Sequence, residues 1–453
     1  MIRAVVLAAG KGTRMRSSRS KVLHALCGRP MLWHVLRALR DADVSDVLVV
    51  GNAEVCGLAP ELSSDAGLGS LEVVLQEPQL GTGHAVQIAL EKLAPKRGTL
   101  LVLNGDLPLV EADLIRRTAA TRDGEIAAAL VTATMPLPSA FGRIVRGGLD
   151  RVAKIVEARD ASDDELALDE MNAGLYAYDE AKLRAAIAEL RNDNAQGEFY
   201  LTDTIGRLVS QGDRVVPILA EDYRSVLGVN DRAELAAATA LLNRRLCEHH
   251  MRNGVTIVDP ARTYLEPDLE IAADATILPN TAIGRRSTIG AHSEIGPNCR
   301  IANAKIGEHT IVTESVVLDS TLADFVYVGP FAHIRGGSEL GTGVRIGDFV
   351  ETKAAKLAAG VRAAHLSYLG DTTVGERTNI GAGTITCNYD GVKKNTTTIG
   401  KDVFIGSDSA LVAPLEIGDG AMTGAGSVVI RDVPPGTRVA GNPARPLAEK
   451  EKA

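Results

Sequence analysis

Residues 281–301, TAIGRRSTIGAHSEIGPNCRI, place an isoleucine at every sixth position. Aliphatic residues keep this spacing over residues 271–301 and resume it over 328–346 and 399–417. A short fixed period of this length is typical of a β-solenoid, in which each hexad supplies one strand and one turn. The aliphatic side chain points inward, and the small residue that often follows it permits a tight corner. Because the period resumes in register after interruptions, chance spacing does not explain it.

The chain before this repeat has a different pattern. Continuous apolar runs at residues 3–9, 47–50 and 100–103 predict strands that are buried on both faces. Helical patterns lie between them at residues 30–40 and 84–93. This alternation of strand and helix predicts an α/β domain with a mostly parallel sheet.

The length of 453 residues also indicates more than one domain. A helical pattern at residues 231–252 separates the two kinds of sequence, with Leu235 and Leu242 on one of its faces. We therefore predict an α/β domain over residues 1–230, a linker helix over 231–252 and a solenoid domain over 253–453.

Composition limits the choice of partner and compartment. A net charge of -8 argues against nucleic acid or anionic lipid as the main partner, because both select basic surfaces, so we expect small-molecule substrates. No stretch reaches the roughly 18 apolar residues of a membrane helix, and the amino-terminal apolar run is too short for a signal peptide. The five cysteines are widely spaced without a C-x-x-C pair, as in reduced thiols. We expect a cytoplasmic protein that does not enter a membrane.

The first apolar run ends in a glycine loop, LAAGKGTRM, at residues 7–15. Its backbone N–H groups and the start of the next helix could bind phosphate, and Lys11, Arg14 and Lys21 could neutralise a triphosphate. The loop is neither a dinucleotide fingerprint nor a Walker motif. An ordinary turn between strand and helix explains it equally well.

Two further segments favour a nucleotide site. Gln76 and the segment QLGTGHA at residues 79–85 offer amide, hydroxyl and backbone groups suited to a base edge. Asp106 follows a buried strand, at the carboxyl edge where open α/β sheets bind ligands, and a carboxylate suits Mg²⁺. A helix N-cap is the alternative role of Asp106 taken alone.

The motifs LAAGKGTRM, QLGTGHA, GDLPL, FGRI, IVEARD, MNAGLY and LGVNDR follow one another in the first half, and PFAHIRGGSEL, GDFVETKAAKL, AAHLSYLGD, TNIGAGTITCNYDG and VFIGSDSALVAP in the second. In this order they resemble the bifunctional N-acetylglucosamine-1-phosphate uridylyltransferase and glucosamine-1-phosphate acetyltransferase family, over nearly the whole chain. The resemblance implies a Rossmann-like nucleotidyltransferase domain followed by a left-handed parallel β-helix of hexapeptide repeats. Ser20 departs from the family, which usually has proline before Lys21.

The resemblance implies transfer of UMP from UTP to N-acetylglucosamine-1-phosphate with Mg²⁺, with pyrophosphate released. Arg14 and Lys21 would act on the phosphates as catalytic residues. The residues that would bind UTP are Leu7, Ala8, Ala9, Gly10, Lys21, Gln76, Gly81 and Thr82. Gly142, Glu157, Asn172 and Asn230 would hold the sugar phosphate, and Asp106 and Asn230 the metal.

The solenoid would first acetylate glucosamine-1-phosphate with acetyl-CoA. Acyl transfer to an amine needs a base, and His365 suits that role because its reference pKa is near ~6.5. A lone histidine is more often structural, so this role is implied by the resemblance. It also implies that Arg335, Lys353, Tyr368 and Asn379 bind the sugar phosphate, and that Ala382, Asn388, Tyr389, Ser407, Ala425 and Arg445 bind acetyl-CoA. Arg438 is an alternative to Arg445, and the family implies a homotrimer.

Two other classes remain open. One is a single-activity sugar nucleotidyltransferase whose solenoid only oligomerises or regulates, and the set His365, Asn388 and Tyr389 argues against it. The other is a structural trimeric scaffold with a degenerate enzyme domain. The presence of Arg14, Lys21 and Asp106 argues against that class.

Overall fold

The computed structural model describes residues 2–69 and 71–447, so the last six residues of the predicted solenoid domain lie outside the described part. The chain divides into two compact units, Met1–Leu242 and Asn243–Ala453. The division falls inside helix α8 (Arg232–Arg252). Among the described helices, none is both long and apolar enough to cross a bilayer.

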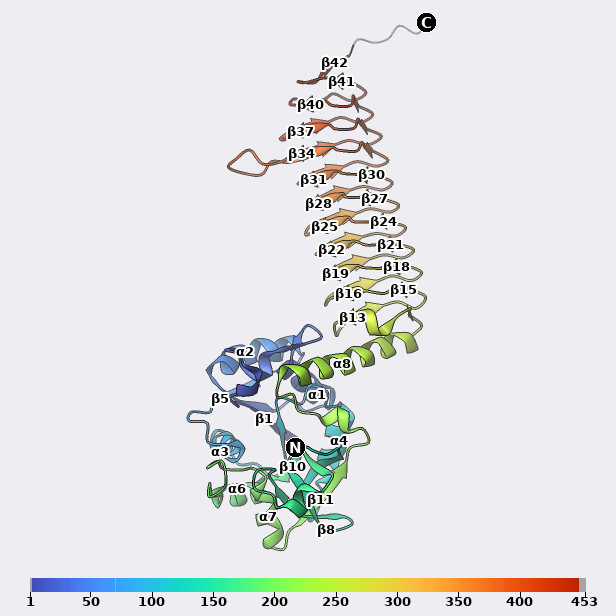
Figure 1. Ribbon diagram of the computed structural model, residues 1–453. Coiled ribbons are helices and arrows are strands. Elements are labelled where there is room, and N and C mark those ends of the chain that lie inside the picture. Colours follow the sequence, from blue (N-terminus) through green and yellow to red (C-terminus); the bar gives the residue numbers. More distant parts are fainter. Residues whose placement is uncertain (1, 70, 448–453) are drawn as a thin grey trace. The chain divides into compact units, whose positions relative to one another are not determined.

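The first unit contains a mixed sheet in which the central path runs β11-β7-β10-β6-β1-β4-β5 (Figure 1). β10 runs antiparallel to β6 and β7, and the other pairs along this path are parallel. The strands are β1 (Ile2–Ala8), β4 (Val47–Gly51), β5 (Leu71–Leu75), β6 (Thr99–Asn104), β7 (Ile126–Thr134), β8 (Arg143–Gly148), β9 (Arg151–Val156), β10 (Glu170–Asp179) and β11 (Arg214–Leu219), with a separate hairpin β2 (Ala25–Leu26) and β3 (Arg29–Pro30). β1, β4 and β6 coincide with the three predicted apolar runs to within a residue at each end.

Helices cover both faces of this sheet. α1 (Met31–Asp41), α2 (Ala53–Asp65) and α4 (Ala112–Thr121) contribute buried side chains to the core on one face. α3 (Thr82–Lys92), α6 (Glu180–Ala188) and α7 (Asp203–Ser210) do so on the other. The remaining short helices are α5 (Asp163–Leu166), η1 (Thr13–Met15), η2 (Lys21–Leu23) and η3 (Tyr223–Val226). This arrangement confirms the α/β class.

The second unit is a parallel β-helix, in which each coil adds one strand to each of three sheets (Figure 1). One sheet contains β12 (Thr256–Ile257), β15 (Thr276–Ile277), β18 (Glu294–Ile295), β21 (Ile311–Val312), β24 (Tyr327–Val328), β27 (Arg345–Asp348), β30 (Arg362–His365), β33 (Asn379–Ile380), β36 (Phe404–Ile405), β39 (Met422–Thr423), β41 (Arg438–Ala440) and β42 (Arg445–Pro446). We call it the first helix sheet.

The second helix sheet contains β13 (Thr263–Leu265), β16 (Thr281–Ile283), β19 (Arg300–Ala302), β22 (Val316–Leu318), β25 (His333–Arg335), β28 (Glu351–Lys353), β31 (Tyr368–Gly370), β34 (Ile385–Cys387), β37 (Ala410–Val412) and β40 (Val428–Val429). The third contains β14 (Glu270–Ile271), β17 (Thr288–Ile289), β20 (Lys305–Ile306), β23 (Thr321–Leu322), β26 (Glu339–Leu340), β29 (Lys356–Leu357), β32 (Thr372–Val374), β35 (Thr397–Ile399) and β38 (Leu415–Ile417). A single-turn helix, η4 (Pro260–Arg262), precedes β13.

The predicted hexad residues form the interior of this β-helix. Ile277, Ile283, Ile289 and Ile295 are at most 2% exposed, and they belong to one continuous core that extends to Val439. Non-glycine residues with left-handed backbone, such as Asp319 with φ 49°, form many of the corners. The period therefore predicted both the solenoid and the side chains that fill it.

A loop between β34 and β35, over residues 388–396, interrupts the regular coils and projects from them (Figure 1). Helix α8 precedes the first coils and contributes a buried side chain to a core in each unit. Ala238 packs in a cluster with Leu26, Met31 and Leu109. Cys247 belongs to the core of the β-helix.

We expect Ile346→Ala to destabilise the β-helix by about 2–5 kcal/mol, because Ile346 is 0% exposed and truncation leaves a cavity between coils. Ile430→Ala is the matched control, since Ile430 is 47% exposed. Chemical denaturation followed by circular dichroism measures both. Equal loss for the two variants would contradict the interior role of the hexad isoleucines.

Candidate active sites

A cavity of about 470 Å³ opens in the first unit, at the carboxyl ends of β1 and β6. The predicted UTP-binding residues all line it: Leu7, Ala8, Ala9, Gly10, Lys21, Gln76, Gly81 and Thr82. Asp106 lines it as well. The cavity therefore brings together a glycine loop, an amide side chain and a carboxylate.

The helix predicted at residues 30–40 is α1, but it does not directly follow the glycine loop. The loop continues into the single turn η1, and the next α-helix begins at Met31. Gly12 has φ +56°, and a side chain there would place its Cβ 2.7 Å from the Cβ of Lys21. Glycine at this position thus allows the loop to fold back against Lys21.

Four of the predicted phosphate and metal residues meet at one edge of this cavity. The Lys21 ammonium forms an ion pair with the Asp106 carboxylate and also donates to Asn230 Oδ1 at 3.1 Å. Arg14 donates to the same Asn230 oxygen at 2.9 Å. Asp106 is held in turn by a hydrogen bond from the Val229 N–H to its main-chain oxygen, at 3.1 Å.

This edge offers the oxygen ligands that Mg²⁺ prefers. Asp106 supplies a carboxylate and Asn230 an amide oxygen, and a magnesium ion commonly takes its other ligands from water and substrate phosphate. No group of three or more His, Cys, Asp or Glu side chains suited to a metal occurs within the described residues. The donor set therefore fits an ion that is shared with a bound nucleotide.

The predicted sugar residues form a second group. The Asn172 N–H donates to the Gly142 main-chain oxygen at 2.8 Å, and a Cβ on Gly142 would lie 3.5 Å from Glu157 Oε2. Glu157 Oε1 accepts a hydrogen bond from Thr202 at 2.9 Å. Burial raises the pKa of Glu157 above its ordinary value, and the nearby carboxylates of Asp203 and Asp160 add to the effect. These sugar residues are not among those that line the 470 Å³ cavity.

Sequence reasoning missed several residues of the cavity wall. Arg159, Gln196 and Glu198 line it, and the last two come from the segment that connects α6 to α7. The Phe199 N–H donates to the Leu80 main-chain oxygen at 2.8 Å, and the Gly83 N–H donates to the Phe199 main-chain oxygen at 2.7 Å, so that segment is held beside QLGTGHA. Their only local signal is polarity, so the sequence could not place them.

In the β-helix, His365 has a carboxylate partner on the preceding coil. Asp348 in β27 and His365 in β30 are register partners, and Asp348 Oδ1 lies 2.5 Å from His365 Nδ1. Both side chains are solvent-accessible, at 59% for His365 and 36% for Asp348. Asp348 stands in the quoted motif GDFVETKAAKL but was not assigned a role, because nothing local marks it as the partner of His365.

The predicted sugar-phosphate residues of the β-helix lie mostly on one sheet. Arg335 and Lys353 are register partners, and Tyr368 lies on the next strand, β31. Arg335 forms an ion pair of 2.6 Å with Glu351. The neighbouring ammonium of Lys394, from the projecting loop, lowers the pKa of Lys353. Asn379 lies instead in β33, on the first helix sheet.

The residues predicted for acetyl-CoA occupy the loop and the corners. Asn388 donates to Asp371 at 2.5 Å, and the Tyr389 hydroxyl donates to the Gly391 main-chain oxygen at 2.8 Å. Ala382, Ser407 and Ala425 occur at corners of successive coils, where main-chain hydrogen bonds join one coil to the next. Arg438 and Arg445 are both exposed in the last strands, so burial does not choose between them.

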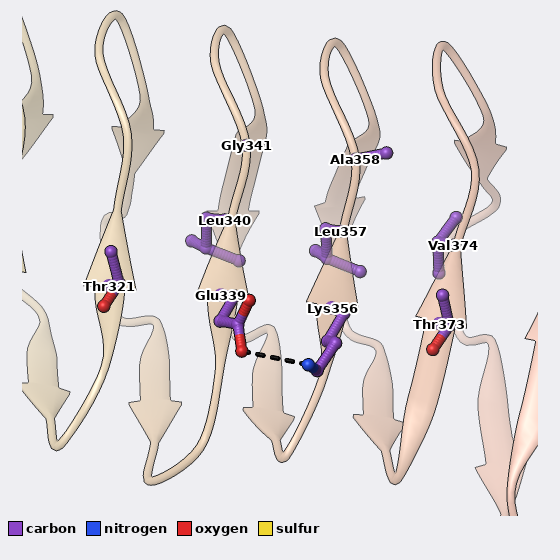
Figure 2. A pocket seen from close by; sticks show the side chains of 9 residues that line it. All are labelled: Thr321, Glu339, Leu340, Gly341, Lys356, Leu357, Ala358, Thr373 and Val374. Atoms are coloured by element: carbon purple, nitrogen blue, oxygen red, sulfur yellow. Dashed lines mark ion pairs between the residues drawn. The ribbon is translucent and has the colours of Figure 1, made fainter.

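A second hollow of about 390 Å³ lies on the third helix sheet, and it contains none of the predicted site residues. Figure 2 shows its wall of successive strands, with Thr321, Glu339, Lys356 and Thr373 at corresponding positions. Glu339 and Lys356 form an ion pair of 3.1 Å. The outward-facing side chains of these four strands are therefore polar, and two of them are paired.

Different family models match the two units of the chain. Residues 4–200 match the model of the MobA-like NTP transferase domain. Residues 262–357 match the GMPPB C-terminal domain, and residues 396–431 match the bacterial transferase hexapeptide (six repeats). Each unit thus resembles a transferase domain in its own right.

Among whole-chain relatives, the bifunctional protein GlmU of Brevibacillus brevis is 45% identical over 434 residues, covering 96% of this chain and 93% of that protein. The bifunctional proteins GlmU of Corynebacterium jeikeium and Staphylococcus haemolyticus are each 43% identical. They cover 96% and 95% of this chain, and 90% and 95% of their own lengths.

Fold, sites and comparisons together define a bifunctional transferase, with a nucleotidyltransferase domain followed by a left-handed hexapeptide-repeat β-helix. The chain belongs to the family of the bifunctional protein GlmU. The resemblance drawn from the sequence motifs is confirmed. The chain is thus an enzyme of UDP-N-acetylglucosamine synthesis, with uridylyltransferase and glucosamine-1-phosphate acetyltransferase activities.

Burial of Glu157 predicts a pH-dependent stability. Because the pKa of Glu157 is raised in the folded state, its carboxyl group does not destabilise the fold below pH 4.5, where it is protonated in both the folded and the unfolded chain. The free energy of unfolding decreases as the pH rises from 4.5 through the folded-state pKa, because the buried group then loses its proton. We expect Glu157→Gln, which keeps an oxygen for Thr202, to raise the melting temperature at pH 7.5 but not at pH 4. Calorimetry at the two pH values measures this, and a lower melting temperature at both would contradict it.

Proposed function

We propose that the two reactions take place at the two sites described above. The β-helix acetylates glucosamine-1-phosphate, and the first unit then transfers UMP from UTP to N-acetylglucosamine-1-phosphate. The observation that carries this proposal is the meeting of Asp106, Lys21, Asn230 and Arg14 at the edge of the glycine-loop cavity. Cations and metal-type ligands at one place are what a triphosphate requires.

In the uridylyltransferase site, UTP occupies the cavity with its phosphates against the glycine loop. A phosphate oxygen of N-acetylglucosamine-1-phosphate attacks the α-phosphorus of UTP, and pyrophosphate leaves in line. Mg²⁺, held by Asp106 and Asn230, neutralises phosphate charge when bound. Arg14 and Lys21 bind the phosphate oxygens, and Lys21 exchanges its ion pair with Asp106 for the nucleotide. Catalysis comes from positioning and charge, because the protein forms no bond to substrate.

Gly142, Glu157 and Asn172 hold the sugar. Glycine at position 142 leaves space beside Glu157, whose carboxylate is oriented by Thr202. A carboxylate and an amide can accept and donate hydrogen bonds to sugar hydroxyls and the acetamido group. Arg159, Gln196 and Glu198 are further candidates for polar contacts with the substrates, because they line the 470 Å³ cavity.

In the acetyltransferase site, His365 is the general base. Asp348 accepts the Nδ1–H of His365, which leaves Nε2 to take a proton from the substrate amine. The amine nitrogen then bonds to the acetyl carbon, the carbon–sulfur bond breaks, and the CoA sulfur leaves as a thiol with the proton that His365 had accepted. Arg335 and Lys353 bind the sugar phosphate, and Tyr368 and Asn379 contact the sugar. The corners of the coils leave room for the pantetheine arm of acetyl-CoA, at Ala382, Ser407 and Ala425. Asn388 and Tyr389 orient the thioester, and Arg445 binds the CoA phosphates.

We further propose a homotrimer, built on the first helix sheet. Ile311 and Tyr327 on that sheet are 39% and 38% exposed. Phe331 and Phe349, at its edge, stack at 5.5 Å between centroids and are 55% and 57% exposed. Apolar surface of this kind marks an interface, whereas the exposed side chains of the four third-sheet strands in Figure 2, which are Thr321, Glu339, Lys356 and Thr373, are polar.

Several thiols support a cytoplasmic location. Cys56, Cys247, Cys299 and Cys387 are not in disulfides, as is usual in a reducing compartment. UTP and acetyl-CoA as co-substrates fit the same location.

We expect Asp106→Asn to abolish uridylyl transfer and spare acetyl transfer, and His365→Asn to do the reverse. The reason is that each residue belongs to the site of one compact unit. Acetyl transfer is measured with glucosamine-1-phosphate and acetyl-CoA. Uridylyl transfer is measured separately with N-acetylglucosamine-1-phosphate, UTP and Mg²⁺, so that it does not depend on acetylation. If Asp106→Asn lowered both activities equally, the division of labour would be wrong.

We expect Ile311→Asp to dissociate the trimer, because it places a charge in the apolar patch that Ile311 forms with its register partner Tyr327. Light scattering should then give a smaller mass, with acetyl transfer reduced and uridylyl transfer retained. Thr373→Asp on the polar third sheet is the matched control and should leave the mass unchanged. A wild-type chain that scatters as a monomer would rule the trimer out.

A further inference from the structure

Gln76 has both protons of its side-chain amide engaged within the first unit. Nε2 donates to the main-chain oxygen of Gly81 at 2.9 Å and lies 3.3 Å from His84 Nδ1. A carbonyl oxygen only accepts, so the atom that faces Gly81 is the amide nitrogen. Because an amide nitrogen only donates, His84 Nδ1 accepts, and the ring proton is on Nε2.

The amide oxygen of Gln76 is the atom that remains for a ligand. Oε1 takes part in none of the hydrogen bonds between described residues, although Gln76 lines the cavity and is 5% exposed. A buried side chain with its protons engaged and its oxygen available presents an acceptor only. It can therefore pair with a donor on a bound base but not with a second acceptor.

We propose that His84 is a positioning residue that fixes Gln76 as an acceptor and so selects uracil over cytosine. The inference rests on the proposed function, in which the cavity takes UTP. Uracil carries an N–H donor at N3, which Gln76 Oε1 can accept. Cytosine has a lone pair at the same position, and two facing acceptors repel.

His84 is needed because one anchor does not define the amide. With Gly81 alone, the amide can swing about a single hydrogen bond and turn its second proton towards the base. His84 takes up that proton, and its own ring is set by its place in the first turn of α3 and by Phe199, with ring centroids 6.5 Å apart. Gln76 is fixed at its other end by a main-chain hydrogen bond of 2.9 Å to Gly51.

The test is the ratio of kcat/KM for UTP to that for CTP, measured in uridylyl and cytidylyl transfer by the full chain. We expect His84→Leu to lower this ratio about tenfold or more, the scale of one lost polar contact. His84→Asn should keep the wild-type ratio, because the Asn oxygen can occupy the position of Nδ1 and accept the same proton. Phe199→Leu, which alters the ring contact but neither hydrogen bond, should also keep it.

Two controls separate failure of this inference from failure of the proposed function. Circular dichroism and thermal unfolding of the same preparations report that the first unit of each variant is folded, and calorimetric binding of UTP and CTP gives the ratio if turnover is too slow. A wild-type enzyme that makes UDP-sugar while His84→Leu discriminates as well as wild type overturns the role of His84 alone. The role of His84 is also overturned if His84→Asn loses as much discrimination between UTP and CTP as His84→Leu does. The same holds if Phe199→Leu loses as much discrimination as His84→Leu. A wild-type chain that uses no UTP overturns the proposed function.

Discussion

The second unit depends on the hydrogen-bonded stacking of one backbone coil on the next. The approach is close: a Cβ on Gly381 would lie 2.5 Å from the nitrogen of Ser407, and one on Gly406 would lie 2.6 Å from the nitrogen of Ala425. Small residues at these corners are therefore a requirement of the ladder as well as of any ligand beside it. The same stacking sets chemically active side chains from neighbouring coils next to each other, as with Asp348 and His365.

Much of this architecture could be predicted from the sequence. The hexad isoleucines predicted the solenoid because each of them must point inward. The continuous apolar runs predicted the central strands of the α/β sheet. The pairing of Asp348 with His365 was beyond that reasoning. They are 17 residues apart, whereas three hexads would pair Asp348 with Leu366. A coil one residue short shifts the register, and only the backbone reveals it.

For the nucleotide cavity, too, the sequence predicted only part of the lining. Gln76, Thr82 and Asp106 stand in or beside motifs that follow strands, so their meeting at one sheet edge was foreseeable. Gln196 and Glu198 reach the same cavity through main-chain contacts between residues more than a hundred positions apart. Such contacts depend on how α6 and α7 pack, and no local pattern encodes them. The single turn in which the glycine loop folds back against Lys21 was likewise not foreseeable from the sequence.

Helix α8 has a consequence for how the chain can be divided. Its first half contributes Ala238 to a core with Leu26, Met31 and Leu109, and its second half contributes Cys247 to the β-helix core. Asn243, between them, donates to the Thr263 carbonyl and accepts from the Leu265 N–H, and so closes the open end of the first coils. A fragment that stops before α8 would expose leucines, and one that starts after it would leave the coils uncapped. Either unit expressed by itself therefore has to include its own portion of α8, and a boundary placed at either end of this helix would leave one of the two units incomplete.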